Sequence, residues 1–92
     1  MLHQSEKECF ICGYQGEALH RHHIYAGKNR NKSEEYGMWV WLCYWHHNDG
    51  SKNCVHNNPS LDKMLKEEGQ REFEKYIGSR SKFRLVFDKS YI

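Results

Sequence analysis

Cysteine and histidine are concentrated between residues 9 and 56, and this feature most constrains what the chain can fold into. All four cysteines and six of the seven histidines of the 92-residue sequence lie in that stretch. They form short-spaced groups, namely Cys9-x-x-Cys12, His22-His23, Cys43-x-x-His46-His47 and Val55-His56. Apolar packing does not explain so many coordinating side chains, whereas metal binding does, and the doubled histidines predict two metal sites.

The first predicted site is a structural zinc site built from two knuckles. Two thiolates at Cys-x-x-Cys spacing, Cys9 and Cys12, can hold one side of a tetrahedral Zn²⁺ ion. Cys43 and His46, at the same spacing, can complete its coordination. Cys54 could replace His46 as the fourth ligand, but its spacing from Cys43 makes no knuckle, so we expect it to be a free thiol.

Length and composition predict one small intracellular domain. A chain of 92 residues buries a modest core, so a structural metal would add stability. The 14% aromatic content favours a folded domain, and the formal net charge of +2 is a mild basic bias compatible with nucleic acid. No segment resembles a signal peptide or could span a membrane, which predicts a cytoplasmic protein without a membrane partner. In that reducing compartment a Cys-x-x-Cys pair binds metal or performs redox chemistry, and the redox alternative lacks a thioredoxin-like context here.

Two short strands are predicted on either side of a polar loop. Residues 18–25 contain His-His-Ile-Tyr, and strand alternation would place His22 and His23 on opposite faces. Both histidines can serve one site only if the strand ends, twists or bulges there. Residues 38–42 form the second predicted strand, whose two tryptophans share one face while its other apolar side chains share the opposite face.

The polar loop, residues 26–37, carries the cations Lys28, Arg30 and Lys32 in alternation with asparagines. A charged loop of this kind is usually solvated, which is one interpretation. The other interpretation is that these three side chains bind the phosphates of a nucleic acid, because histidines flank the loop on both sides. The neighbouring tryptophans also allow two interpretations, of which packing is more common than base stacking.

The C-terminal part of the chain is predicted to contain a helix and a strand, after a polar segment over residues 48–58. Asn58 and Pro59 suit the N-cap and the first position of a helix over about residues 59–77. Apolar side chains at helical spacing predict a core-facing stripe, which consists of Leu61, Met64, Leu65, Phe73, Tyr76 and Ile77. Residues 82–87 alternate in the manner of a terminal strand. The predicted fold class is therefore α+β.

The order of these motifs resembles that of the HNH endonucleases, also called ββα-metal or His-Me finger nucleases. In that family a His-His-Ile element, a Leu-Cys-x-x-His-His element and a later Val-His element follow one another. The corresponding residues here are His22-His23-Ile24, Leu42-Cys43-x-x-His46-His47 and Val55-His56. The resemblance covers about residues 9–56 and is strongest to small phage-type HNH nucleases and to the nuclease domain of the phage recombination-enhancement protein. It implies a zinc-stapled ββα-metal domain over residues 1–92, with the C-terminal helix and strand added to that core.

The resemblance also implies a role for each remaining histidine in hydrolysing the phosphodiester bonds of DNA. His22 and His47 would bind the catalytic divalent metal, with His56 as a third ligand, and His23 would be the general base that activates water. An imidazole suits that role because its pKa, about 6.5, is close to the operating pH. The catalytic metal would be Mg²⁺, or Mn²⁺ or another divalent transition metal, since Mg²⁺ prefers oxygen ligands whereas imidazole nitrogens suit transition metals. A domain this small has little room to recognise bases, so a targeting protein or a homodimer would direct it to DNA.

One position departs from the family pattern. The asparagine that orients the general base usually stands five residues before the strand-end cysteine, where this chain has Met38. The side chain of Ser33, Glu34, Glu35 or Tyr36, or a backbone carbonyl, could take its place. The sequence leaves these alternatives open.

A non-catalytic zinc module that binds nucleic acid or a protein is the alternative function. In such a module the histidines outside the zinc site need not converge. The nuclease hypothesis requires that His22, His47 and His56 meet at one point, with His23 beside them and open to solvent. The two hypotheses therefore predict different geometries.

Overall fold

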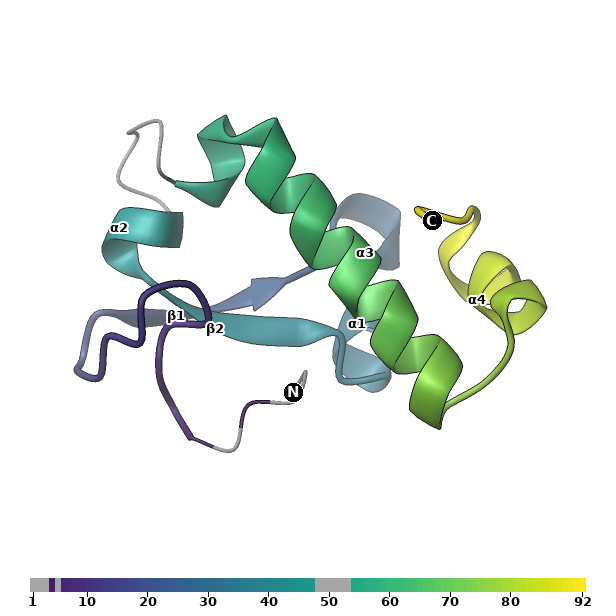
Figure 1. Cartoon of the computed structure of the whole chain (residues 1–92), viewed down its shortest axis with the longest axis horizontal. Helices are drawn as coiled ribbons and strands as arrows, with labels where there is room; N and C mark the ends of the chain where they lie inside the picture. The colour runs from purple at the N-terminus through teal and green to yellow at the C-terminus, as the bar shows by residue number, and fades with distance from the viewer. Residues whose placement is uncertain (1–3, 5, 48–53) are drawn as a thin grey trace.

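The computed structural model describes residues 4, 6–47 and 54–92, so residues 48–53 of the predicted polar segment lie outside the described residues. The elements in chain order are β1 (Leu19–His23), the 3-10 helix η1 (Gly27–Asn29), α1 (Arg30–Glu35), β2 (Trp39–Cys43), α2 (Tyr44–His47), the 3-10 helix η2 (Val55–Asn57), α3 (Pro59–Tyr76) and α4 (Arg80–Phe87). The fold is a small α+β domain, in which α2 and α4 lie at opposite sides of the molecule (Figure 1). Among the described helices, none is both long and apolar enough to cross a membrane.

The sheet consists of β1 and β2 alone, paired antiparallel, within the part of the chain that the structure describes. Its register pairs Arg21 with Trp41 and His23 with Trp39. Val40, on the opposite face, is completely buried, whereas the two tryptophans are only partly buried. The prediction that the two tryptophans share one face of this strand, opposite to its other apolar side chains, is therefore confirmed.

The Cys-x-x-Cys knuckle packs onto β2 through backbone hydrogen bonds. The Gly13 N–H donates to the Cys9 carbonyl at 2.9 Å, which closes the knuckle. Gly13 has a φ of 77°, a left-handed conformation that glycine adopts without a Cβ clash. The Phe10 N–H donates to the Trp41 carbonyl at 2.8 Å, so the knuckle is fixed to the sheet beside the end of β2.

The predicted polar loop over residues 26–37 is wrong in part, because it contains η1 and α1. A helix of six residues has too few turns to show a periodic apolar face, and tertiary contacts hold it in place. Ser33 makes such contacts, because its buried hydroxyl donates to the Met38 carbonyl and accepts from the Tyr25 N–H at 3.3 Å. This one side chain joins α1 to the end of β1 and to the start of β2.

Helix α3 begins as the sequence predicts. The Asn58 side chain accepts a hydrogen bond from the Leu61 N–H at 3.1 Å, and Pro59 is the first helical residue. The predicted core stripe is correct for Leu65 and Phe73, both completely buried. It is wrong for Met64, Tyr76 and Ile77, whose exposed fractions are 37%, 67% and 37%. Periodicity shows which face of a helix is apolar, but neighbouring elements decide how much of that face is covered.

Gly69 on α3 packs directly against Tyr25, which is 1% exposed. The Tyr25 hydroxyl donates to the Lys66 carbonyl at 2.7 Å, and a Cβ added at residue 69 would lie 2.7 Å from that hydroxyl oxygen. The sequence predicts only that this glycine weakens the helix. The structure shows that its missing side chain lets α3 approach Tyr25.

Gly69→Ala is therefore expected to destabilise the domain, although alanine is the better helix former by about 1 kcal/mol. Overpacking against a buried ring costs about 1–3 kcal/mol, so we expect a net loss of about 1 kcal/mol in the free energy of unfolding. Urea unfolding followed by circular dichroism measures it. Gly78→Ala is a control outside the helix, where the nearest atom to the new Cβ is Cδ of the flexible Lys82 side chain. Equal stability of the two variants would contradict the packing argument.

The predicted terminal strand over residues 82–87 is wrong, because these residues lie in helix α4. The Ser79 side chain caps this helix by accepting from the Lys82 N–H at 3.2 Å. Phe83 and Phe87, four residues apart, are both buried and pack around the Tyr25 ring at centroid distances of 5.5 and 4.4 Å. The alternation of basic and apolar residues also fits a helix at this spacing, and the aromatic core selects the helix.

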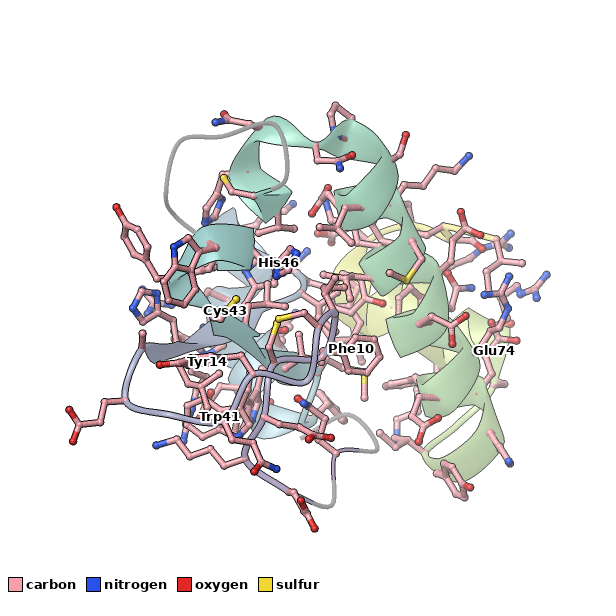
Figure 2. The ribbon with its side chains drawn as sticks, turned by 60° about the vertical axis from the view of Figure 1, so that its left-hand side comes forward. Phe10, Tyr14, Trp41, Cys43, His46 and Glu74 are labelled. Atoms are coloured by element: carbon pink, nitrogen blue, oxygen red, sulfur yellow. The ribbon has the colours of Figure 1, made fainter. Side chains whose placement is uncertain are left out.

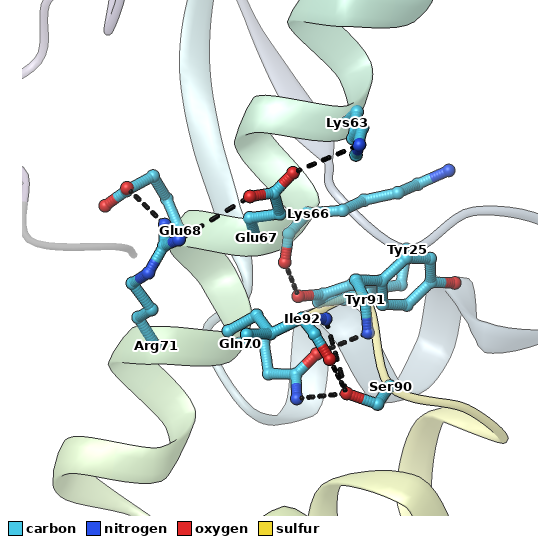
Figure 3. A network of polar contacts seen from close by, with 10 residues as sticks. All are labelled: Tyr25, Lys63, Lys66, Glu67, Glu68, Gln70, Arg71, Ser90, Tyr91 and Ile92. Atoms are coloured by element: carbon cyan, nitrogen blue, oxygen red, sulfur yellow. Dashed lines mark hydrogen bonds and ion pairs between the residues drawn. The ribbon is translucent and has the colours of Figure 1, made fainter.

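The buried side chain of Gln70 on α3 hydrogen-bonds to the C-terminal segment at Ser90 and Tyr91 (Figure 3). Its amide nitrogen donates to the Ser90 hydroxyl at 2.9 Å, and its amide oxygen accepts from the Tyr91 N–H at 2.6 Å. A buried amide is stable only when its donors and acceptor are satisfied, as they are here. These contacts close the core on the α4 side of the molecule, away from the histidine-rich end of the sheet.

Candidate metal centres

Four side chains bring their ligand atoms together at the α2 end of the sheet: Cys9, Cys12, Cys43 and His46. All four atoms lie within 4.8 Å of one another. The Cys12 and Cys43 sulfurs are 3.7 Å apart, and the Cys9 sulfur is 3.7 Å from Nδ1 of His46. Sulfur ligands about 2.3 Å from a tetrahedral zinc ion would lie about 3.8 Å apart. The group therefore has the size and the ligand types of a site for a metal ion such as zinc.

Three local structures position this group. The knuckle supplies Cys9 and Cys12, the last residue of β2 is Cys43, and α2 carries His46 one turn later. Figure 2 shows Cys43 and His46 beside each other where the strand meets the helix. Cys54 is buried but does not belong to the group, so His46 is its fourth member.

The thiol groups of this site have divergent acidities. Burial raises the pKa of Cys43 to about 11. Burial also raises the pKa of Cys9, but backbone N–H groups, led by that of Cys43, outweigh it and hold this pKa below its usual value. A bound cation would lower both pKa values, because coordination deprotonates a thiol. The donor set therefore fits a metal ion better than a cluster of neutral thiols.

A second group is formed by His22 from β1, His47 from α2 and His56 from η2, whose ligand nitrogens also lie within 4.8 Å of one another. Their ring centroids are separated by 5.2, 5.7 and 4.8 Å. His22 is 6% exposed, and its Nε2 has no hydrogen-bond partner among the described residues. A buried polar atom without a partner is costly, and a cation bound by the three rings would satisfy it.

The pKa values of His22 and His47 favour the neutral imidazole, which is the form that binds a metal. Burial, followed by the nearby His47 and His56, lowers the pKa of His22 to about 3. Burial, followed by His56 and His20, lowers the pKa of His47 to about 4. At neutral pH these rings keep a nitrogen lone pair, and such donors suit a divalent transition metal.

His20 joins this group through a contact that the sequence does not reveal. Its Nδ1 lies 3.0 Å from Nδ1 of His47, a hydrogen-bond distance. The contact engages Nδ1 of His47 and leaves Nε2 as the nitrogen that could bind a metal. His20 shares a face of β1 with His22, and this alternation is the signal that could have placed it near the group.

Replacing His20 by leucine is expected to weaken Mn²⁺ binding by the zinc-loaded protein about 10–100-fold, the usual effect of removing a side chain that orients a metal ligand. His20→Asn should retain most of the affinity, because the asparagine oxygen can accept the same hydrogen bond from His47. Isothermal titration calorimetry of the two variants and the wild type measures the difference. If all three bound Mn²⁺ equally, His20 would not orient His47.

His23 faces away from His22 but borders the same surface hollow. The strand ends at His23 and the chain bends at Ile24 and Tyr25. As a result, both histidines line a hollow of about 390 Å³, together with Arg21, Ala26, Gly27, Arg30, His47 and His56. The sequence predicts that His22 and His23 can serve one site only if the strand ends or distorts at this point, and β1 does end at His23.

Glu34 is the residue that holds His23. Its Oε2 lies 2.6 Å from Nε2 of His23, and its Oε1 bonds to the Arg21 guanidinium. The hydrogen bond with His23, together with Arg21, keeps the pKa of the Glu34 carboxyl below its usual value. Glu34 is one of the residues that could replace the family's asparagine, and its carboxylate contacts the His23 ring. Ser33, another of those residues, instead hydrogen-bonds to backbone groups.

The three cations of the predicted phosphate-binding loop do not all face the histidine hollow. Arg30 lines the hollow beside the histidines. Lys28 pairs instead with Asp88 at 3.1 Å, and Lys32 also acts on that carboxylate. The sequence reasoning missed Arg21, which lines the hollow too. Arg21 and His23 are two residues apart in β1, so strand alternation could have placed them on one face.

Comparison with known proteins gave no match of any kind. No family model, no curated protein and no solved structure matches this chain.

Proposed function

We propose that this protein is a metal-dependent endonuclease of the HNH, or ββα-metal, type, which hydrolyses phosphodiester bonds in DNA. The observation that carries the proposal is the convergence of His22, His47 and His56 at a hollow that His23 also lines. A non-catalytic zinc module has no use for a second ligand group. It would also gain nothing from the buried Nε2 of His22, which lacks a partner among the described residues.

Each ligand group has a different task in this proposal. Zn²⁺ held by Cys9, Cys12, Cys43 and His46 would have a structural role, because four protein ligands would leave no open position for a substrate. His22, His47 and His56 would hold a divalent cation, either Mg²⁺ or a transition metal such as Mn²⁺. When bound, that cation would supply Lewis-acid stabilisation of the phosphate and of the leaving 3′-oxygen.

His23 is the general base of the proposed reaction. Its Nε2 is engaged by Glu34, which leaves Nδ1 as the atom that takes a proton from the attacking water. The negative carboxylate of Glu34 keeps the ring oriented and stabilises the imidazolium that forms. Glu34 thereby takes the place of the asparagine that usually orients this base in the family.

Arg30 is placed to hold the phosphate. It lines the hollow with His23, and a guanidinium group can bind two phosphate oxygens at once. Positive charge at this position also offsets the charge that builds up as the phosphate is attacked. These contacts bind the DNA backbone and carry no sequence information, so we expect cleavage of low sequence specificity.

Incubation of the zinc-loaded protein with supercoiled plasmid tests the proposal. Added Mn²⁺ or Mg²⁺ should convert the plasmid to nicked or linear product, and no conversion is expected without either cation. A protein that is folded, zinc-loaded and able to bind Mn²⁺, but leaves the plasmid supercoiled, would contradict the proposal and favour the zinc module.

A further inference from the structure

A second hollow adjoins the first, and the proposed reaction assigns no part of the substrate to it. It measures about 450 Å³ and is lined by Arg21, His23, Arg30, Asn31 and Glu34. Its size falls within the range of about 300–1,000 Å³ that is typical of small-molecule sites. Arg21, His23 and Arg30 line both hollows, so a ligand in one would continue into the other.

We propose that this second hollow, called the nucleotide subsite below, binds one unpaired nucleotide next to the phosphate that is cleaved. The substrate class is then single-stranded or locally unpaired DNA. The inference rests on the proposed nuclease function and adds the form of DNA that the site accepts.

The Arg21 side chain supplies a flat surface for a base. Its guanidinium carbon lies 4.1 Å from the centroid of the Trp39 ring and 5.9 Å from that of Trp41. The indole of Trp39 thus supports the guanidinium from the sheet side, and the Arg21 side chain is still 44% exposed. Bases stack on planar guanidinium groups as they do on aromatic rings.

The register of the sheet brings this surface next to the general base. His23 pairs across the strands with Trp39, and Arg21 pairs with Trp41, so the four side chains share one face. A base stacked on Arg21 therefore lies beside the ring of His23. The adjoining phosphate of the same nucleotide would be within reach of that ring.

The charges in the nucleotide subsite decide which part of a nucleotide enters it. The Glu34 carboxylate bonds to both Arg21 and His23 and repels a phosphate from this hollow. Arg30 lines both hollows and offers a positive charge at their shared border. The phosphate would bind there, and the uncharged sugar and base would occupy the subsite, where the Asn31 amide can donate to and accept from a base edge.

Only an unpaired nucleotide can use these contacts. Within a duplex both faces of a base are covered by its neighbours, and its Watson–Crick edge is paired. Stacking on Arg21 and hydrogen bonding to Asn31 require the base to leave that arrangement. The free energy needed to unstack a base is far smaller in a single strand than in a duplex, where the base must also lose its pairing.

Binding of labelled DNA to the zinc-loaded protein, without added Mn²⁺ or Mg²⁺, tests this proposal. Fluorescence anisotropy would compare a short single-stranded oligodeoxynucleotide with a blunt duplex of the same sequence, and a gel would verify that both stay intact. We expect the single strand to bind more tightly. Arg21→Lys retains the charge but loses the planar group, and should weaken single-strand binding about tenfold while changing duplex binding less.

Two further variants keep the test decisive. Asn31→Ala should also weaken single-strand binding more than duplex binding. Arg71→Lys makes the same chemical change as Arg21→Lys on the exposed side of α3, where Arg71 bonds to Glu68 at 2.8 Å, and should have no effect. Equal affinities for the two DNA forms, with Arg21→Lys and Asn31→Ala no weaker than Arg71→Lys, would overturn the proposal.

The two proposals fail in different ways. A wild-type protein that cleaves plasmid but shows no preference for the single strand would contradict the nucleotide subsite and leave the nuclease function supported. A protein that prefers the single strand through Arg21, but cleaves nothing with any divalent cation, would contradict the nuclease function. It would still support the binding of an unpaired nucleotide.

Discussion

Replacing His23 by alanine is expected to lower the rate of plasmid cleavage by about 10²–10⁴-fold, the usual contribution of a general base. The variant loses the nitrogen that would accept the proton from water, and the Glu34 carboxylate loses the ring that it holds at 2.6 Å. The effect should appear in kcat more than in KM, because proton transfer occurs in the transition state and binding of the phosphate depends on Arg30.

Binding measurements separate His23 from the metal ligands. His23→Ala should bind Zn²⁺ and Mn²⁺ as the wild type does and unfold at the same urea concentration. His22→Ala should lose Mn²⁺ binding as well as cleavage, because His22 belongs to the histidine group and His23 does not. Cleavage by His23→Ala at the wild-type rate would mean that another group is the base or that the preparation contains a second nuclease.

Replacing Cys43 by serine is expected to unfold most of the domain at neutral pH. Zinc binding contributes about 10–16 kcal/mol to small zinc-stabilised domains, which is as large as the whole stability of a typical domain, about 5–15 kcal/mol. Cys43 is 1% exposed and joins the end of β2 to the ligand group, so its loss affects both the metal and the sheet. A serine hydroxyl stays protonated at neutral pH and is a poor zinc ligand.

The matched control is Cys54→Ser, since Cys54 is equally buried but lies outside the ligand group. This variant should retain one zinc-binding site and lose only about 1–3 kcal/mol in its free energy of unfolding, as expected for a buried polar substitution. Zinc content by atomic absorption and folding by circular dichroism measure both variants. A Cys43→Ser protein that is folded with unchanged zinc content would show that the zinc site lies elsewhere.

Features that depend on neighbours in the sequence could be predicted. The knuckle needs only two cysteines at fixed spacing and Gly13 in a left-handed conformation, and the start of α3 needs only the Asn58 side chain before Pro59. The split of the two adjacent histidines, His46 to the cysteines and His47 to the histidines, follows from the turn of about 100° between adjacent helical residues. These outcomes are set by local geometry.

Features that depend on contacts with residues outside the element could not be predicted. Residues 82–87 have a pattern that fits a strand or a helix, and the contacts of Phe83 and Phe87 with Tyr25 select the helix. Likewise, α1 is too short to be recognised by periodicity, and the hydrogen bonds of Ser33 fix it. For α4 the deciding partner, Tyr25, is distant in sequence, whereas for α1 the partners of Ser33 are nearby residues outside the helix.

The sequence by itself determined the metal-ligand motifs, because ligand type and short spacing are local properties. The tertiary structure alone decided how the site around them is assembled. It brought His56 to His22, placed Glu34 on His23, and aligned Arg21 with Trp39 across the sheet. The physical reason is that side chains far apart in the chain meet only when the sheet and the helices pack, and the free energy of that packing comes from the whole core.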